Sequence, residues 1–508
     1  MRRAGCASTH APFCGKLGDD TRGDIDAAGL SVGIMEKAVA PFLSHASGPA
    51  FGGDQRDVFW FVAEWSLMPR IGLIAMSGVR IIHPDLAWLG VTLPQFVSRG
   101  HVIASLPSLP LLIFGALTPP DVELEYFEVP HIEDLNLEKL PPFDLVAIAS
   151  YSAQIDEAYE LADVYRAQKT KVVMGGPHVS ALPDEALEHA DCVVLGEAEP
   201  LWPGLLDDFF SGRLKSIYRE ENPGTFDLAT SPIPRFDLLD PRQYNRIPIL
   251  TSRGCPHDCE FCAGSKNFGP GYRQKPVKNI IAELEALGQI WERPFVEFAD
   301  DNTFVNPDWS NELVDAIAPH KIRWFAETDV SIAENTDLLK KMRAAGCYQL
   351  LIGFESQNPA RLDAIDRTGW KASKADSYID AVREIQSHGI TVNACFIVGL
   401  DGDGPEVFDR IREFDRVAEP LEIQVTVQTP FPGTRLYDRL QKEGRLDPLP
   451  FWNQCTLFDL VYDPIGMTRA EIETGMFDLF RDLYDEKAYQ RRKTQFRELM
   501  RRVKKGRG

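Results

Sequence analysis

Short apolar runs recur through the first half of the chain, each bounded by glycine, proline or a polar side chain. They occupy residues 71–76, 144–149, 171–174 and 192–195. Runs without polar alternation are typical of strands that are buried on both faces. Stretches with helical periodicity, such as 155–168 and 183–189, lie between them. This alternation predicts an α/β domain over 69–212, with a doubly wound, Rossmann-like parallel sheet and a ligand crevice at the carboxyl ends of its strands.

A second series of apolar runs follows a stretch that is rich in proline. Residues 213–245 hold four prolines among charged positions, a composition that predicts an extended linker. The later runs occupy residues 247–251, 295–298, 322–326, 349–354, 391–398 and 423–427. Helical patterns such as 277–287 and 375–388 separate them. Six strand and helix units in series predict a TIM-type barrel, partial or complete, over 246–446, with its chemistry on the loops after the strands.

The two ends of the chain carry weaker patterns. Residues 1–68 show no clear period, and we expect an N-terminal extension to which the sequence assigns no function. Residues 447–508 have a helical pattern, and the last 22 of them hold ten Lys or Arg against one Glu. A solvated helix end and a docking site for an acidic partner both explain this basic tail.

The composition narrows the classes of function. The chain has 508 residues, with 54 Lys and Arg against 75 Asp and Glu and a net charge of −21, which disfavours binding to nucleic acid. The longest apolar runs fall short of the roughly 18 residues of a membrane helix, and the first residues lack the apolar core of a signal peptide. Nine cysteines are too few for a disulfide scaffold. We therefore expect a cytoplasmic protein without a transmembrane segment.

Three of the cysteines lie within eight positions directly after the first strand of the second series. Cys255, Cys259 and Cys262 follow Gly254 in a CxxxCxxC spacing that brings three thiolates into one loop. Structural zinc needs a fourth donor, and His257 is the local candidate. A cubane iron–sulfur cluster can be held by three thiolates with one iron left open. The spacing favours the cluster, while zinc and unrelated thiols are the alternatives.

This loop resembles the signature of the radical S-adenosylmethionine (SAM) superfamily, in which CxxxCxxC follows the first barrel strand. The resemblance extends to Arg253-Gly254 before the cluster and to Phe261 before its last cysteine. It includes three further segments at predicted strand ends: Phe298-Ala-Asp-Asp-Asn302, Ile352-Gly-Phe-Glu355-Ser356 and Gln428-Thr-Pro-Phe-Pro-Gly-Thr434.

Membership would imply a radical enzyme whose [4Fe-4S] cluster is held by Cys255, Cys259 and Cys262. In the family, the open iron binds the amino and carboxylate groups of SAM. One electron from the reduced cluster then cleaves the sulfonium to give a 5′-deoxyadenosyl radical, which abstracts hydrogen from substrate. The resemblance therefore also implies a small-molecule substrate and an electron donor such as flavodoxin or ferredoxin.

Six residues at or near the predicted strand ends match positions that contact SAM in the family. They are Phe261, Asp300, Asp301, Glu327, Glu355 and Gln428. Simpler roles exist for several of them. Asp-Asp-Asn is also good turn chemistry, Glu355 suits a buried ion pair, and Gln428 suits a hydrogen-bond filler at a strand end.

Segments of the first predicted sheet resemble the cobalamin-binding domain that precedes the barrel in one subclass of the superfamily. They run from Leu109 to Pro119, Asp144 to Ser152, Val173 to His178 and Leu195 to Glu199. The residue types agree, because paired glycines allow close approach to a flat ligand and hydroxyls at strand ends can bind it. The implied cobalamin contacts are Ser150, Tyr151, Ser152, Gly175, Gly176, His178, Gly196 and Glu197.

Cobalamin enzymes that ligate cobalt through histidine carry a DxHxxG pattern. After the first strand this chain has His83-Pro-Asp85-Leu-Ala-Trp-Leu-Gly90, in which the order is reversed, so we expect no histidine ligand there. We expect His178 to make hydrogen bonds in its loop rather than to ligate cobalt. A domain that has lost cobalamin and only contacts substrate is the alternative.

The two domains together imply methylation of an unactivated carbon, with the radical abstracting hydrogen and methylcobalamin supplying the methyl group. Three segments look most like the hopanoid methylases and the anaerobic magnesium-protoporphyrin ester cyclase group: Phe396 to Gly404, Thr434 to Tyr437 and Gly196 to Trp202. We expect a cobalamin-dependent C-methyltransferase that acts on a small, largely apolar metabolite. A non-methylating oxidoreductase or cyclase, and a non-catalytic corrin or cluster sensor, are the alternatives.

Overall fold

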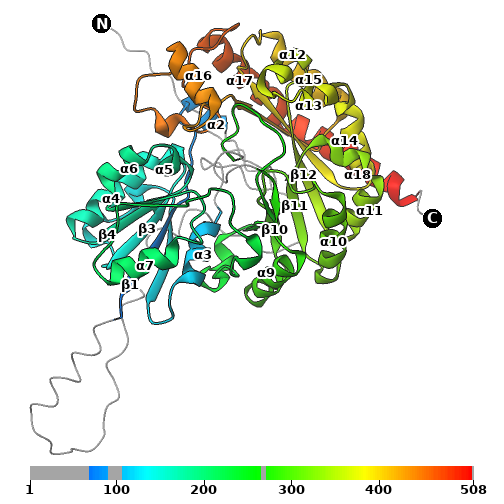
Figure 1. Cartoon of the computed structure of the whole chain (residues 1–508). Coiled ribbons are helices and arrows are strands. Elements are labelled where there is room, and N and C mark those ends of the chain that lie inside the picture. Colours follow the sequence, from blue (N-terminus) through cyan, green and yellow to red (C-terminus); the bar gives the residue numbers. More distant parts are fainter. Residues whose placement is uncertain (1–67, 90–105, 265–270, 506–508) are drawn as a thin grey trace, which may run out of the picture. The chain divides into compact units, whose positions relative to one another are not determined.

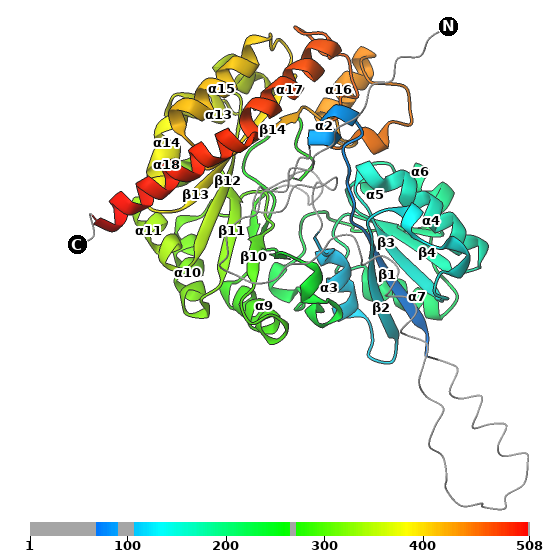
Figure 2. The ribbon, with the colours of Figure 1, turned by 180° about the vertical axis from the view of Figure 1, so that it is seen from behind.

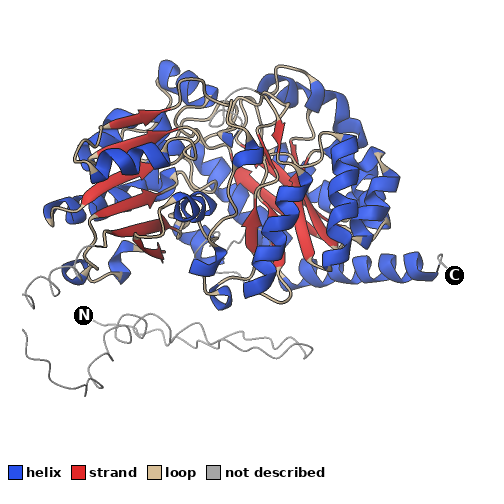
Figure 3. Cartoon of the chain, turned by 60° about the horizontal axis from the view of Figure 1, so that its bottom comes forward, coloured by secondary structure: helices blue, strands red, loops and turns tan. Residues whose placement is uncertain are grey.

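The computed structural model describes residues 68–89, 106–264 and 271–505. All but one residue of the expected N-terminal extension therefore lies outside the described residues. In the described ranges, no helix has both the length and the apolar character that crossing a bilayer requires. The strands of two parallel sheets are flanked by helices (Figure 3).

The first sheet has six strands in the order β2-β1-β3-β4-β5-β6, all parallel. The strands are β1 (Arg70–Met76), β2 (Glu123–Val129), β3 (Leu145–Ala149), β4 (Lys171–Gly175), β5 (Cys192–Leu195) and β6 (Ile217–Arg219). This is a doubly wound order of the flavodoxin type. The predicted Rossmann-like sheet is confirmed, and its four predicted strands are β1, β3, β4 and β5.

The two outer strands were not predicted because they lack a continuous apolar run. Strand β2 reads Glu-Leu-Glu-Tyr-Phe-Glu-Val and lies at one edge, where charged side chains are tolerated and protect the edge from further pairing. Strand β6 is three residues long and lies inside the stretch that the prolines predicted to be a linker. That stretch otherwise holds only short 3-10 turns.

Alternate residues of each central strand enter two different apolar cores. Ile74, Ile148 and Met174 face helix α4, whereas Leu73, Ala147 and Val173 face helices α3 and α7. Both faces are thus covered, as the unbroken apolar runs predicted. The helices of this half are α2 (Pro84–Leu89), α3 (Leu109–Leu117), α4 (Ile155–Ala167), α5 (Pro177–Ala181), α6 (Pro183–His189) and α7 (Trp202–Phe210), several of which are labelled in Figure 1.

The second sheet has six parallel strands in the order β14-β13-β12-β11-β10-β7. The strands are β7 (Ile247–Ile249), β10 (Phe295–Phe298), β11 (Arg323–Thr328), β12 (Cys347–Glu355), β13 (Thr391–Val398) and β14 (Glu422–Val427). All six predicted strands are present. Among the described residues β7 and β14 do not pair, so the barrel is partial.

Helices cover the outer side of this sheet (Figure 2). They are α9 (Val277–Ile290), α10 (Pro307–Ile317), α11 (Thr336–Ala344), α12 (Pro359–Ile365), α13 (Trp370–Lys374), α14 (Tyr378–Ser387) and α15 (Glu406–Ala418). Local signals set their starts. The Asn306 side chain accepts hydrogen bonds from the first turn of α10, and Pro307 occupies the first helical position. The helices leave the carboxyl ends of the strands free to carry functional loops.

The C-terminal region begins with helix α16 (Arg435–Glu443) and ends with α17 (Arg469–Tyr484) and α18 (Glu486–Lys505). A capping box of Thr468 and Glu471 starts α17. Residues 447–468, which the pattern predicted to be helical, are mostly irregular. The reason is tertiary packing: Phe451, Trp452 and Val461 enter the α4 side of the first core. The C-terminal region thus completes the N-terminal half.

We expect Trp452→Ala to lower the free energy of unfolding by about 3 to 5 kcal/mol, because it removes a buried aromatic ring and leaves a cavity. The indole is 2% exposed, and its Nε1 donates to Glu185 Oε2 at 3.3 Å. Urea denaturation followed by circular dichroism measures the change. The control is Ile233→Ala at a side chain that is 45% exposed, where we expect a change within about 0.5 kcal/mol. Equal losses in the two variants would contradict the packing described.

Candidate functional site

The cysteine loop joins strand β7 to helix α9. Its two ends meet because β8 (Ser252–Arg253) pairs antiparallel with β9 (Arg273–Gln274). Gly254 has a φ of +82°, and a Cβ there would lie 2.2 Å from the Gly271 carbonyl oxygen. Only glycine fits that turn. The loop therefore starts at a fixed point directly before Cys255.

The three cysteines of the loop form no disulfide, and their thiols lie within electrostatic reach of one another. Burial raises the pKa of Cys255 to about 11 and raises that of Cys259 further, and the charge of Cys262 adds to both shifts. In the part of the chain that is described, three or more His, Cys, Asp or Glu side chains do not converge tightly enough to ligate a single ion. A cubane cluster does not need such convergence, because each thiolate binds a different iron. The donor set therefore fits a cluster better than zinc.

The loop after β10 supports the start of the cysteine loop. Asp300 is buried, and its carboxylate accepts hydrogen bonds from the Thr251 and Ser252 amides (2.7 and 2.8 Å) and from the hydroxyls of Thr251 and Thr303. Those bonds occupy the carboxylate on both oxygens. Asp301 accepts from the Gly254 amide, and burial raises its pKa to about 6. Of the two aspartates, Asp301 keeps more acceptor capacity for a ligand.

A second polar chain reaches the middle of the cysteine loop. Asp329, after β11, accepts from the His257 ring at 2.9 Å and from Asn302 Nδ2 at 2.8 Å. Burial opposes ionisation of Asp329, but these bonds and those from Ser331 outweigh it and lower its pKa. The ring of Trp370 lies 4.2 Å from that of His257. His257 is thus engaged with a carboxylate rather than directed to a metal beside the cysteines.

Glu355 ends strand β12 in a left-handed conformation, with a φ of +60°, next to an irregularity in strand register. A non-glycine residue in that region is strained, and surrounding structure must hold it there. Lys371 does so, since its Nζ lies 3.0 Å from Glu355 Oε1 and 3.2 Å from the Gly353 carbonyl oxygen. The carboxylate raises the pKa of this buried lysine against the opposing effect of desolvation. The ion-pair role considered for Glu355 is therefore present.

The other predicted SAM contacts lie around the same end of the barrel. Phe261 is partly buried against the barrel core. Burial, followed by the charges of Glu297, Asp301 and Asp300, raises the pKa of Glu327 to about 8. Gln428 follows β14 and is 2% exposed, and its Oε1 lacks a hydrogen-bond partner among the described residues. A buried acceptor without a partner is suited to a ligand or an ordered water.

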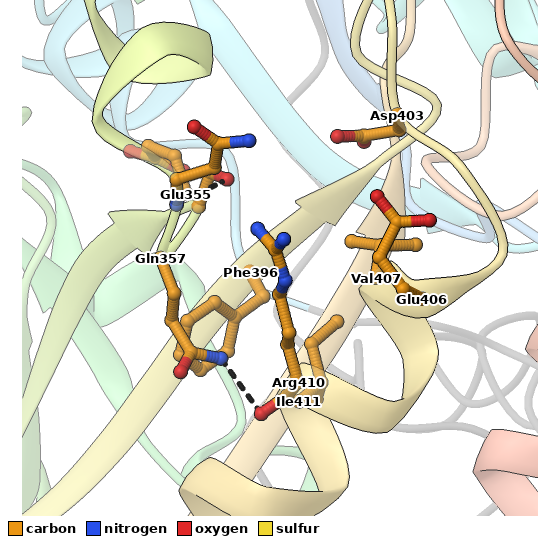
Figure 4. A pocket seen from close by; sticks show the side chains of 10 residues that line it. Glu355, Gln357, Phe396, Asp403, Glu406, Val407, Arg410 and Ile411 are labelled. Atoms are coloured by element: carbon orange, nitrogen blue, oxygen red, sulfur yellow. Dashed lines mark hydrogen bonds between the residues drawn. The ribbon is translucent and has the colours of Figure 1, made fainter.

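A small cleft adjoins Glu355 between β12, β13 and α15 (Figure 4). Asp403, Glu406 and Arg410 line it, and Gln357 Nε2 donates to the Arg410 carbonyl oxygen at 2.8 Å. The space at its centre is about 10 Å³, enough for about one water molecule and far too small for a nucleotide. Glu355 must therefore meet any cofactor on its other side.

The predicted cobalamin contacts gather at the carboxyl ends of three neighbouring strands. Ser150, Tyr151 and Ser152 follow β3, Gly175 ends β4 and Gly176 follows it. Gly176 has a φ of +115°, and a Cβ there would lie 3.0 Å from the Ser150 carbonyl oxygen. Tyr151 is 64% exposed. A small-residue edge with an accessible aromatic ring suits the face of a flat ligand.

His178 is fully buried and both of its ring nitrogens are engaged. Nδ1 lies 3.0 Å from Ser152 Oγ, and Nε2 lies 3.1 Å from Glu185 Oε1. Tyr159 and Trp452 also donate to the Glu185 carboxylate, whose pKa these bonds lower against the effect of burial. His178 in this state holds Ser152 in place and has no nitrogen left for cobalt, as expected from the sequence.

Gly196 and Glu197 follow β5, the strand next to β4 in the sheet. The Gly196 amide donates to Ser180 Oγ at 3.2 Å, and a φ of +84° makes glycine favourable there. The Glu197 carboxylate is completely buried and pairs with Arg253 and Arg273, the residues at the two ends of the cysteine loop. The first sheet and the barrel therefore meet at this point.

Comparison with known proteins agrees with this geometry. Family models match residues 249–414 (radical SAM superfamily), 130–206 (B12 binding domain) and 434–507 (a domain of unknown function). An uncharacterized methyltransferase of Pyrococcus horikoshii is 31% identical over 361 residues, which are 66% of this chain and 77% of the relative. The chain belongs to the radical SAM superfamily.

This radical SAM protein has further relatives of similar construction. The bacteriochlorophyllide d C-12(1)-methyltransferase of Chlorobaculum tepidum is 28% identical over 417 residues, which are 80% of this chain and 89% of the relative. The solved structure of TsrM, a radical SAM methyltransferase of Kitasatospora setae, has a TM-score of 0.57 at 16% identity, and the match covers 83% of this chain and 86% of that one. That likeness shows a shared fold.

The protein is therefore a cobalamin-binding radical SAM enzyme, with a [4Fe-4S] cluster, SAM and cobalamin as cofactors. Enzymes of this superfamily need a reductant and act on small substrates. The sequence did not single out Asp329, which supports the cysteine loop, or Lys371, which holds Glu355. Asn302 was named only as the last residue of a motif. The positions of Asn302 and Asp329 after strand ends are a signal that could have indicated a functional role. Lys371 lies in helix α13, far from any motif, and has no such signal.

We expect Glu327→Gln to stabilise the apoprotein at high pH. Burial raises the pKa of Glu327 from 4.5 to about 8, so the folded state binds this proton more tightly than the unfolded state. The stability from this group is complete below about pH 4.5 and is lost as pH rises through 8. At about 1.4 kcal/mol per pKa unit, the gain at pH 9 should be about 1 to 3 kcal/mol and close to zero at pH 5.

Thermal denaturation of wild type and variant across this pH range checks the expectation. Glu292→Gln, at an exposed side chain, is the matched control and should show no pH-dependent difference. A gain for Glu327→Gln that is the same at pH 5 and pH 9 would contradict a raised pKa.

Proposed function

We propose that the protein is a C-methyltransferase that transfers a methyl group to an unactivated carbon of a small, largely apolar metabolite. The observation that carries this proposal is the meeting of the two carboxyl edges at the pair of Glu197 and Arg253. A substrate between these edges can reach both cofactors.

The residues of the chain have distinct parts in this proposal. Cys255, Cys259 and Cys262 hold the cluster, and Phe261, Asp301, Glu327, Glu355 and Gln428 border the space for SAM. The loops of Ser150 to Ser152, Gly175-Gly176 and Gly196 border the corrin, and the described histidine of that edge, His178, stays on Ser152. When bound, the cluster and SAM supply the radical that takes a hydrogen atom, and cobalamin supplies the methyl group. Asp300 holds the cysteine loop rather than SAM.

The proposal includes a cellular compartment, an electron donor and a class of substrate. Cysteines that form no disulfide, such as those at the cluster site, are typical of a reducing compartment, so we place the protein in the cytoplasm. The same compartment contains flavodoxin or ferredoxin, either of which can deliver the single electron. Rigid, polycyclic metabolites such as tetrapyrroles or terpenoids suit the acidic protein better than a polyanion does, because the net charge is −21.

Label transfer tests the reaction directly. We expect SAM with a trideuterated methyl group, added with a reductant and cobalamin, to place three deuterium atoms in the product from bacteriochlorophyllide d or a hopanoid. Mass spectrometry of the product and of 5′-deoxyadenosine measures both events. Product that forms with 5′-deoxyadenosine but without deuterium would contradict methyl transfer and favour the oxidoreductase or cyclase alternative.

The cluster assignment has its own test. We expect Cys259→Ala to remove most of the iron and acid-labile sulfide and to reduce the release of 5′-deoxyadenosine at least about 100-fold, because one iron loses its protein ligand. The matched control is Cys192→Ala, a buried cysteine in the first core, which should keep its iron. Iron, sulfide and electron paramagnetic resonance measurements on anaerobic protein report the difference. Equal iron contents in the two variants would refute the assignment.

A further inference from the structure

One carboxylate bridges the two ends of the cysteine loop. Glu197 Oε1 lies 2.5 Å from Arg253 Nη1, and its two oxygens lie 3.0 Å from the Nη atoms of Arg273. Arg253 and Arg273 are direct partners in the β8 and β9 pairing. All three cysteines lie between these two arginines in the sequence. The residue that binds both arginines, Glu197, lies in the loop after strand β5 of the first sheet.

A second carboxylate completes the contact. Glu199 pairs with Arg253 through Nη2 and lies 3.4 Å from its Nη1, and it raises the pKa of that guanidinium against the effect of burial. Two positive and two negative charges thus meet in one place. The side chains of Glu197, Glu199 and Arg253 are 0%, 7% and 6% exposed, and that of Arg273 is 20% exposed. We call these four residues the arginine–glutamate joint.

The joint has more contacts than ion pairing alone would require. The Arg253 guanidinium lies 5.8 Å from the centre of the Phe226 ring, and Arg273 Nη1 donates to the Phe226 carbonyl oxygen at 2.9 Å. The Glu197 amide donates to Glu220 Oε2 at 3.2 Å. Paired hydrogen bonds to a planar guanidinium fix direction as well as distance. The joint therefore holds orientation between the loop after β5 and the cysteine loop.

The energetics favour a positioning role over a purely stabilising one. Desolvating four charges is costly, and packed apolar side chains of the same volume often give equal or greater stability. An apolar contact does not fix the relative position and orientation of the two segments that it joins. The loop after β5 is adjacent to the loop after β4, which is next to the loop after β3, and residues of both those loops border the corrin in the proposed function. When the loop after β5 and the cysteine loop have a fixed relative position, the cluster has a fixed position relative to cobalamin.

We propose that Glu197 and Glu199 are positioning residues that set the distance and angle between the cluster and cobalamin. This inference rests on the proposed function for the identity of the two cofactor sites, but not on the fate of the substrate. Loss of the joint leaves each cofactor in its own domain and loosens the relation between them. Misplacement of reacting groups by about 1 Å can cost about 100-fold in rate, so a loose joint matters for transfer between sites.

The test compares the double variant Glu197→Gln, Glu199→Gln with Glu283→Gln in the full-length protein. Glu283 forms an equally buried pair with Lys275, at 2.5 Å, but both of those residues belong to the barrel. Two measurements report the joint without any substrate. Hydrogen exchange with mass spectrometry follows residues 195–199 and 251–264 in the protein as purified. Paramagnetic resonance of the reduced cluster with cob(II)alamin follows the magnetic interaction between them.

We expect the double variant to keep its iron and cobalamin. Exchange in both segments should rise at least about tenfold, and the magnetic interaction should weaken or broaden. Glu283→Gln should leave the magnetic interaction unchanged. An unchanged interaction and unchanged exchange in the double variant, or the same changes in Glu283→Gln, would overturn the proposal.

A second variant covers the case in which the double variant does not fold. Arg273→Gln removes only the more exposed arginine and leaves Arg253 with both glutamates. We expect it to raise exchange in residues 251–264 in the same direction but less, and an unchanged pattern would overturn the proposal. Neither readout requires methyl transfer. A protein that cyclises rather than methylates would therefore fail the label test and still pass this one.

Discussion

The cysteine loop is held from outside, and much of the surrounding structure serves that constraint. Between β8 and β9 the described part of the loop has almost no regular backbone pairing of its own. Helix α16 binds its centre, where Arg435 donates to the Asp258 carbonyl oxygen at 2.8 Å and Arg439 to Glu260 Oε1 at 2.7 Å. The Glu260 amide donates to the Ile365 carbonyl oxygen at 2.9 Å. Satisfied polar networks of this kind rigidify a segment that the backbone alone leaves loose.

Negative charge is concentrated where the proposed cofactors meet. Burial raises the pKa values of Asp300, Asp301 and Glu327, which means that the fold destabilises their ionised forms. The charge of Arg246, which pairs with Glu297, offsets part of this cost for Glu327. Such groups are poised to respond to a cationic ligand, because a sulfonium or an amine stabilises a carboxylate that the empty site disfavours.

The fold could be predicted in large part because its strands are short, apolar and buried on both faces. Strands β3 and β13 are examples in which the run of residues alone gave both type and approximate bounds. Strand β2 could not be found that way, since three glutamates at a sheet edge read as surface. Residues 447–468 were predicted to be helical because local periodicity does not report that Trp452 belongs to a distant core.

The candidate site could likewise be predicted only in part. The three cysteines could be found from the sequence because cluster ligands that share one short loop form a recognisable spacing. Asp300 and Glu355 were predicted at the strand ends where they lie. The sequence could not show that the Asp300 carboxylate accepts hydrogen bonds from the Thr251 and Ser252 amides. Nor could it show that Lys371 pairs with Glu355. Glu197 was predicted to contact the corrin, and the sequence could not show that its carboxylate pairs with Arg253 and Arg273. Partners that are far apart along the chain leave no local pattern.

The placement of Phe451, Trp452 and Val461 has a consequence for biosynthesis. These side chains close a core whose other walls come from strands that end before residue 196. On the ribosome, the first sheet emerges long before the residues that seal it, so its α4 side stays exposed to water until the last quarter of the chain has been made. The N-terminal half cannot reach its final packed state as an independent unit during translation.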